Sequence, residues 1–156
     1  MNDNMKKKLK LKVSAIKDGT VIDHIPAKNL FKVITILGLD HIENQITFGA
    51  NLESEKLGAK AIIKVSGKFF EDDEINKIAL IAPHAKLNII RDYEVVEKRV
   101  VEIPDQIKGI VKCFNPKCIT NHEKIQTCFK VVSKEHLALK CAYCEKITAG
   151  DQITMF

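Results

Sequence analysis

The stretch CFNPKCITNHEKIQTCFKVVSKEHLALKCAYC, residues 113–144, holds two pairs of closely spaced cysteines with 22 residues between the pairs. The pairs are Cys113 with Cys118 and Cys141 with Cys144. Zinc prefers four soft ligands in a tetrahedron, and two tight loops that each deliver two thiolates provide this with little strain. Four thiolates leave no position for water, so we expect one structural zinc ion per chain. Iron bound by the same four sulfurs is the alternative.

Other residues in this stretch are weaker candidates for metal binding or redox chemistry. Cys128 is the fifth cysteine and belongs to neither pair, and we expect a buried free thiol there. A redox Cys-x-x-Cys normally opens a helix in a thioredoxin-like βαβ unit, which the surrounding pattern does not provide. His122 and His136 are further candidate ligands, but four cysteines already suffice.

The cysteines divide the chain of 156 residues into two regions, because all five follow residue 112. We predict a first domain over residues 1–102 and a zinc-binding domain over residues 103–156, joined near Pro104, which removes a backbone donor. The second region offers short strands over 109–113, 127–133 and 136–141, too few to bury a core alone. A small all-β domain of this size often needs a metal as a staple.

The first region shows alternating strand and helix periodicity. The predicted elements begin with a strand over 9–15 and a helix that has Pro26 in its first turn, apolar residues at helical spacing from Leu30 to Leu37, and Gly38 at its end. Strands over 45–52 and 60–67 follow. A second helix is capped by Asp72 or Asp73 and ended by Pro83, and extended chain over 86–101 has a bend at Arg91–Asp92. This βαββαβ order with an extra strand predicts an α+β fold. It is a split-βαβ, ferredoxin-like sandwich with two helices on one face of an antiparallel sheet.

The net charge of +5 is unevenly distributed. Residues 1–12 carry +4, residues 13–103 carry −2 and residues 104–156 carry +3. A domain that binds a polyanion usually concentrates its charge on the fold, and a chain without Trp has few stacking platforms. A zinc-ribbon nucleic-acid-binding module is therefore the alternative function rather than the favoured one.

The sequence gives no sign of membrane insertion or export. No apolar run approaches the roughly 20 residues that a bilayer requires. The basic start is followed by neither an apolar segment nor a small-residue cleavage site, so we expect a cytoplasmic protein.

The segment GTVIDHIP at residues 19–26 places an acid and an imidazole side by side, Asp23 and His24. A carboxylate accepts hydrogen bonds from sugar hydroxyls, and a nearby helix N-terminus suits an anion. On this pattern alone, Asp23 could equally be a helix cap or a surface carboxylate, and His24 an ordinary surface side chain. An acid/base pair in a small enzyme is a further alternative, although no nucleophile or open metal site supports it. Neither a Walker loop nor a G-x-G-x-x-G motif is present.

Taken together, the order of these motifs resembles that of a known family. LKLKVSAIKDGTVIDHIP at 9–26, ITFGANL at 46–52, KAIIKV at 60–65, NIIRDYEVVEK at 88–98 and the cysteine spacing with its CAYCEK ending are similar to the regulatory chain of aspartate carbamoyltransferase. The resemblance implies a non-catalytic subunit with an N-terminal allosteric nucleotide-binding domain and a C-terminal zinc domain that docks on the catalytic chain. It further implies a regulatory-chain homodimer that controls pyrimidine biosynthesis. ATP would activate, CTP and UTP would inhibit, and no nucleic acid or membrane would be bound.

The same resemblance implies roles for particular residues. Asp23 and Lys64 would hold the ribose, while Lys98 and His24 would face the triphosphate. The remaining implied positions are Val13, Ile16, Asn88, Tyr93 and Val95 around the base, Lys60 near a second nucleotide or a metal-bridged pair of nucleotides, and Cys113, Cys118, Cys141 and Cys144 as zinc ligands.

Overall fold

The computed structural model describes residues 15–55 and 58–156. The chain forms two compact units, residues 1–102 and residues 103–156. The strand expected over 9–15 lies outside the described residues except for Ala15, and so does Val13. None of the helices in the described ranges has the length and hydropathy that crossing a bilayer would require.

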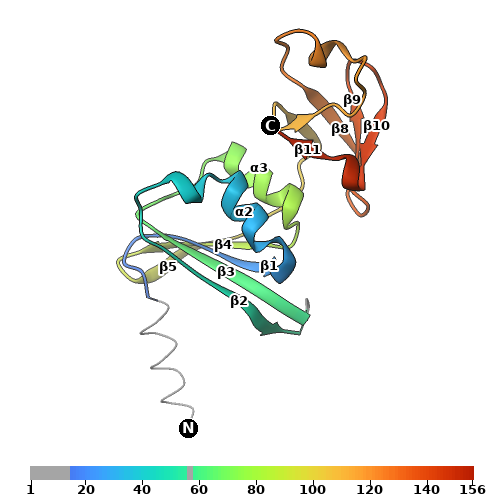
Figure 1. The fold of residues 1–156 in the computed structure, drawn as a ribbon. Coiled ribbons are helices and arrows are strands. Elements are labelled where there is room, and N and C mark those ends of the chain that lie inside the picture. Colours follow the sequence, from blue (N-terminus) through green and yellow to red (C-terminus); the bar gives the residue numbers. More distant parts are fainter. Residues whose placement is uncertain (1–14, 56–57) are drawn as a thin grey trace. The chain divides into compact units, whose positions relative to one another are not determined.

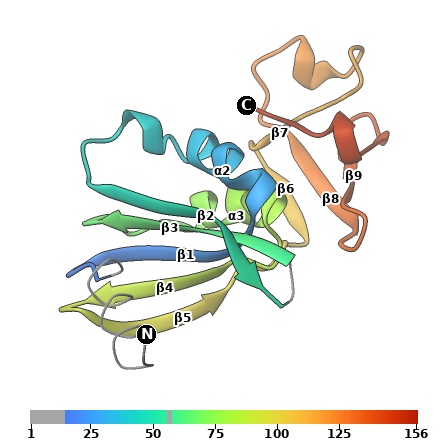
Figure 2. The same ribbon diagram turned by 60° about the horizontal axis from the view of Figure 1, so that its bottom comes forward.

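The first unit is a five-stranded antiparallel sheet covered by two helices. Its elements are β1 (Gly19–Pro26), α2 (Leu30–Ile36), β2 (Ile46–Ser54), β3 (Gly58–Ser66), α3 (Asp72–Ile81), β4 (Lys86–Arg91) and β5 (Glu94–Val100), with 3-10 turns at Ala27–Asn29 and Leu39–His41. Figure 1 shows α2 and α3 on the same face of this sheet. The strand order β2-β3-β1-β4-β5 can be followed in Figure 2. This arrangement is the βαββαβ fold with an extra edge strand, so the predicted α+β class is confirmed.

The central strand, β1, occupies a segment for which the sequence pattern predicted no strand. Ile22 and Ile25 are both fully buried although they are three residues apart, a spacing that would place them on opposite faces of a regular strand. A bulge resolves this, because the pairing of β1 with β3 shifts register between these two residues and His24 adopts a φ of 60°. Pro26 therefore ends this strand, and the prediction that it occupies the first turn of a helix is wrong.

The strand also begins at a glycine that cannot be replaced without strain. Gly19 has a φ of +142°, and a Cβ there would lie 2.1 Å from the carbonyl oxygen of Val65. This close approach sets β1 against β3 at the start of their ladder.

The end of α2 and the start of α3 each have an identifiable structural cause. Gly38, in the left-handed conformation with a φ of 64°, follows the end of α2 as predicted. The start of α3 differs from the prediction, because Glu71 rather than Asp72 or Asp73 is the N-cap. Its side chain forms a capping box with that of Glu74, which satisfies two backbone N–H groups at the helix start.

The core of the first unit lies between the helices and one face of the sheet. Its largest fully buried side chains are Ile22, Ile25, Leu30, Val33, Leu39, Ile63, Val65, Ile78 and Leu87. The sheet therefore has one apolar face against α2 and α3, and its other face is free to carry polar residues.

The second unit consists of short antiparallel strands. They are β6 (Gln106–Lys108), β7 (Val111–Lys112), β8 (Cys128–Ser133), β9 (Ala138–Cys141), β10 (Ile147–Ala149) and β11 (Thr154–Met155), with 3-10 turns at Ile119–Asn121 and Gly150–Gln152. One sheet has the order β10-β9-β8-β6, and β11 pairs with β7. The predicted all-β character is confirmed. Ile107, Val111, Phe129 and Leu139 form a very small core, at most 1% exposed each.

Candidate functional sites

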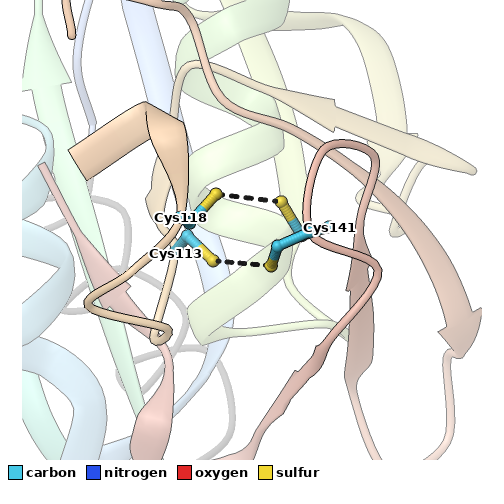
Figure 3. A group of neighbouring side chains, drawn as sticks. Cys113, Cys118 and Cys141 are labelled. Carbon is cyan, nitrogen blue, oxygen red and sulfur yellow. Dashed lines mark hydrogen bonds between the residues drawn. The ribbon is translucent and has the colours of Figure 1, made fainter. Parts of the chain in front are cut away.

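Four cysteine sulfurs come together in the second unit. The Sγ atoms of Cys113, Cys118, Cys141 and Cys144 all lie within 4.8 Å of one another. The Sγ atoms of Cys113 and Cys144 are 3.7 Å apart, and those of Cys118 and Cys141 are 3.8 Å apart. Figure 3 shows Cys113 and Cys118 facing Cys141 across this cluster. A tetrahedral ion with metal–sulfur bonds of about 2.3 Å would separate its sulfurs by about 3.8 Å, so the spacing fits a four-coordinate metal.

Two tight loops orient these sulfurs with backbone donors. At the second loop, Glu145 adopts a φ of 63°, which lets the chain turn back immediately after Cys144. Hydrogen bonds from backbone N–H groups to sulfur run from Asn115 to Cys113, from Tyr143 and Cys144 to Cys141, and from Lys146 to Cys144. Such bonds stabilise thiolates, the form of cysteine that ligates metals.

Burial favours the neutral thiol at two of the four cysteines, so their ionisation to metal-binding thiolates needs a compensating cation. Burial raises the pKa of Cys113 to about 12 and also raises the pKa of Cys141. At Cys144 burial acts in the same direction, but the N–H of Lys146 and neighbouring groups outweigh it and lower the pKa to about 7. Several thiolates this close together need a compensating positive charge, which a bound metal ion supplies.

The other candidates in this unit lie apart from the sulfur cluster. Cys128 is half-buried rather than buried as expected, and it does not belong to the four-cysteine group. His122 and His136 are also outside that group. His136 is exposed, with its Nε2 4.0 Å from a carboxylate oxygen of Glu135.

In the first unit, cross-strand register gathers the predicted nucleotide-binding residues on the face of the sheet opposite the helices. Val21 on β1 pairs with Lys64 on β3 and with Asn88 on β4, and Asn88 pairs in turn with Lys98 on β5. Directly paired residues share a face, so these four form one row across four strands. We call the surface made by Asp23, Lys64, Asn88 and Lys98, together with their neighbours in register, the polar face.

Asp23 is the acidic member of the polar face and is held from two sides. Its Oδ1 lies 3.0 Å from Lys60 Nζ and accepts the backbone N–H of His24 at 2.7 Å. The imidazole Nδ1 of His24 lies 3.5 Å from the other carboxylate oxygen. The bulge in β1 therefore both presents this carboxylate and fixes its orientation. Lys60, predicted to lie near a second nucleotide, here forms an ion pair with Asp23.

Lys64 is a cation in an unusual position, because its residue is only 8% exposed. Burial lowers the pKa of its amino group, and the negative charge of Asp23 offsets part of that shift. A buried cation of this kind costs folding free energy, and groups with pKa values perturbed by burial cluster at functional sites.

The residues predicted to frame a base lie toward the hairpin that joins β4 and β5. Tyr93 is exposed at the hairpin turn, and its backbone N–H donates to the carbonyl of Lys17 at 2.9 Å. This bond holds the turn beside the segment that contains Ile16. Val95 follows on β5 and is half exposed. Val13 belongs to the part of the chain that the structure does not describe.

One lysine of the polar face had not been singled out from the sequence. Lys86 on β4 pairs directly with Asp23. Lys86 lies two residues before Asn88, so the strand period alone would have placed both on the same face. That Asp23 is its neighbour could be recognised only once β1 was known to be a strand.

The two units define a chain that combines a split-βαβ unit bearing a cation-rich polar face with a small β unit built around a metal-binding cysteine cluster. Family models identify the chain more closely. A model described as "Aspartate carbamoyltransferase regulatory chain, allosteric domain" matches residues 11–102, and one described as the metal binding domain of the same chain matches residues 105–154. The chain belongs to the aspartate carbamoyltransferase regulatory chain family.

Individual relatives match over nearly the whole length. The regulatory chain of Phocaeicola vulgatus is 58% identical over 155 residues, which is 99% of this chain and 98% of the relative. That of Bacteroides fragilis is 58% identical over 145 residues, 93% of this chain and 95% of the relative. That of Pyrococcus abyssi is 55% identical over 145 residues, 92% of this chain and 95% of the relative.

Membership in this family confirms the resemblance drawn from the motifs. The chain is a non-catalytic regulatory subunit with an allosteric domain and a metal-binding domain, and its partner is the catalytic chain. The hypothesis that Asp23 and His24 form the acid/base pair of a small enzyme is therefore set aside.

The buried amino group of Lys64 generates a prediction about stability. Lys64→Met removes a desolvated charge while Lys60 remains paired with Asp23, so the ligand-free variant should be more stable by about 1 kcal/mol, or about 4–8 °C in the unfolding temperature of this unit. Because the folded-state pKa is lowered, this gain should shrink as the pH rises through that pKa and the wild-type amine loses its proton.

Differential scanning calorimetry of the ligand-free protein at neutral and alkaline pH measures both effects. Lys32→Met, at an exposed position on α2, is the matched control and should leave the transition unchanged. A lower unfolding temperature for Lys64→Met would show that the amino group stabilises the sheet.

Proposed function

We propose that the chain binds nucleoside triphosphates on the polar face and thereby adjusts the activity of the catalytic chain, with ATP activating and CTP and UTP inhibiting. The effect would place pyrimidine biosynthesis, in the cytoplasm, under the control of its own products and of purine supply. The observation that carries the proposal is the row of Lys64, Asn88 and Lys98 beside Asp23, in the unit that the allosteric-domain model matches.

The polar face offers suitable groups for each part of a nucleotide: the ribose, the phosphates and the base. Asp23 is a carboxylate already oriented by a backbone N–H, and it has the acceptor capacity to bind ribose hydroxyls. Lys98 supplies positive charge, and Lys98 and His24 both offer hydrogen-bond donors for phosphate oxygens. Near the β4–β5 hairpin, Tyr93 and Val95 provide aromatic and apolar surface against which a base can pack.

We further propose that the metal is zinc and that the second unit carries the contact with the catalytic chain. Four thiolates at tetrahedral spacing are a typical structural zinc site, closed to water. The apolar core of this unit is small, so its fold depends on the ion. A docking surface built on that fold would be lost together with the metal.

Regulation in this proposal is a coupling free energy between the nucleotide site and the catalytic chain. A nucleotide shifts the assembly only if it binds one of its states more tightly than the other. Opposite effects of ATP and CTP then require opposite preferences for two states at one site.

The proposed homodimer has a suitable edge at β2. Of its nine residues only Glu53 is charged, and Phe48 and Leu52 are substantially exposed. The opposite edge, β5, carries four charged residues among seven, which protects an edge strand against pairing. Pairing of β2 with a second copy would extend the sheet, and Phe48, whose ring meets that of Phe31 edge-on at 6.0 Å, would be covered.

The nucleotide site is tested by Lys98→Ala. Removal of one charge-assisted contact should weaken ATP and CTP binding by about 1–3 kcal/mol, as measured by isothermal titration calorimetry of the full-length chain. Lys32→Ala, on the helix side of the sheet, is the control. Unchanged affinity in Lys98→Ala would contradict the assignment of this lysine to the pocket.

The metal centre is tested by Cys113→Ala. Loss of one ligand should reduce the metal content from about one ion per chain to nearly none, unfold the second unit and abolish co-elution with the catalytic chain, while nucleotide affinity is retained. Elemental analysis, gel filtration and calorimetry report the three quantities. Cys128→Ala removes a thiol outside the cluster and should change none of them. Co-elution of Cys113→Ala with the catalytic chain would refute the role of the metal in docking.

The dimer is tested by placing a charge on the β2 edge. Phe48→Lys should raise the dimer dissociation constant by at least about tenfold in analytical ultracentrifugation, because each interface would bury two unpaired ammonium groups. Val96→Lys, on the exposed β5 edge, should leave the dimer intact. Dissociation by the β5 variant alone would assign the interface to the other edge.

A further inference from the structure

We propose that Thr120 is a positioning residue of the metal centre, whose hydroxyl donates a hydrogen bond to the sulfur of Cys118 and raises the affinity of the four-cysteine cluster for its ion. The inference rests on the part of the proposed function that places a metal ion among these sulfurs. It concerns a residue that is not itself a ligand, and that neither the cysteine spacing nor the resemblance assigned to the site.

The hydroxyl of Thr120 lies against one of the four sulfurs. Its Oγ1 is 3.2 Å from the Sγ of Cys118. Both residues are buried, with Cys118 1% exposed and Thr120 9% exposed. Water therefore competes little for either atom, and the hydrogen bond acts in a medium of low dielectric constant, where its electrostatic part is strong.

The direction of this hydrogen bond follows from the chemistry of the loaded site. Between a free thiol and a hydroxyl, either atom could donate. A cysteine that ligates a metal is a thiolate, which has no proton and can only accept. In the loaded site the hydroxyl of Thr120 must therefore donate to Cys118, and the bond gains strength because its acceptor is negatively charged.

The backbone around Thr120 fixes where its hydroxyl points. Thr120 is the middle residue of a 3-10 turn that begins directly after Cys118. The side-chain amide of Asn121 donates to the carbonyls of Cys113 at 3.0 Å and of Asn115 at 2.7 Å. Its backbone N–H donates to the carbonyl of Cys118 at 2.9 Å. The turn is thus tied to both ends of the loop that carries the first cysteine pair, so the hydroxyl is directed at the sulfur before an ion arrives.

A fixed donor at Cys118 has two measurable consequences. It holds the Sγ in the orientation that the ion needs, and the loss of such an outer partner typically lowers metal affinity by about 10–100-fold. It also places a partial positive charge beside the filled sulfur orbitals, which lowers their energy and widens the gap to the metal orbitals. The sulfur-to-metal charge-transfer absorption therefore lies at a shorter wavelength than it would without the donor.

The test compares the full-length wild type with Thr120→Val, which keeps the branched shape of the side chain and removes the hydroxyl. Each protein is titrated with Co²⁺ and with Zn²⁺ in competition with a chelator of known affinity, and Co²⁺ also reports the charge-transfer band. Thr120→Val should bind both ions about 10–100-fold more weakly and shift the band to longer wavelength. Thr120→Ser, which restores the hydroxyl, should recover the wild-type affinity and band.

Thr127→Val is the matched control in the same unit. Thr127 is 1% exposed, and its hydroxyl donates to the carbonyl of Val111 at 2.7 Å rather than to a sulfur. Loss of this hydroxyl should destabilise the unit without moving the charge-transfer band. A band shift in Thr127→Val equal to that in Thr120→Val would show that the band follows general destabilisation, and would overturn the inference.

Other outcomes would also count against Thr120. Unchanged affinity and band in Thr120→Val would remove the hydroxyl from the metal centre. A Thr120→Ser variant as weak as Thr120→Val, or an affinity that falls while the band stays in place, would assign the residue to packing alone.

Two further comparisons separate the remaining possibilities. If Thr120→Val takes up no Co²⁺ and shows no band, Thr120→Ser and Thr120→Ala decide, because these two variants differ only in the hydroxyl. Uptake by Thr120→Ser alone would support the inference, and equal uptake by both would overturn it. A folded wild-type chain that binds neither Co²⁺ nor Zn²⁺ would refute the metal centre itself, and the role of Thr120 with it.

Discussion

Both units bury ionisable groups whose charged forms the chain does not fully compensate by itself. In the first unit burial lowers the pKa of Lys64, and in the second it raises the pKa of Cys113 to about 12. Burial thus disfavours the charged form of these groups, and an ion of opposite sign would stabilise that form: an anion near the lysines and a cation among the sulfurs. Any ligand that binds only the folded unit also stabilises it, so binding and folding are linked in both halves of the chain.

The bulge in β1 shows how one local irregularity serves packing and binding at once. Its extra residue allows Ile22 and Ile25 to enter the same core, although their spacing does not fit a regular strand. The same irregularity frees the backbone N–H of His24 from the ladder with β3, and this group donates to Asp23. A change that straightened the strand would therefore expel an isoleucine from the core and release the carboxylate. The site and the core of the first unit depend on the same few backbone dihedrals.

These features explain which parts of the structure could be read from the sequence. The cysteine cluster was predictable because two short loops of fixed spacing need no knowledge of the sheet. The helices were predictable from 3.6-residue periodicity, and the β2–β3 pair from two adjacent strand-like runs. The strand β1 was missed because its bulge disrupts the period of two. The strands β6, β10 and β11 were missed because two or three residues are too short to show any period. Lys86 was missed for a non-local reason, since its neighbours on the polar face come from pairing with the unrecognised β1.

The polar face also constrains how two triphosphates with opposite effects could be distinguished. ATP and CTP carry identical phosphate chains and ribose, so in the proposed site contacts with Lys98 and Asp23 would be available equally to both. Contacts that are equal in two states set affinity but shift no equilibrium, and contacts that are equal for two ligands cannot give those ligands opposite effects. Discrimination must then arise where the ligands differ, at the base. In the proposed site that is the end formed by the β4–β5 hairpin, where the backbone N–H of Tyr93 donates to the carbonyl of Lys17 and ties the hairpin to the segment that precedes β1. A larger purine and a smaller pyrimidine would displace that junction differently. The sign of regulation would therefore be decided at the hairpin, while the lysines of the polar face would determine how tightly either effector is held.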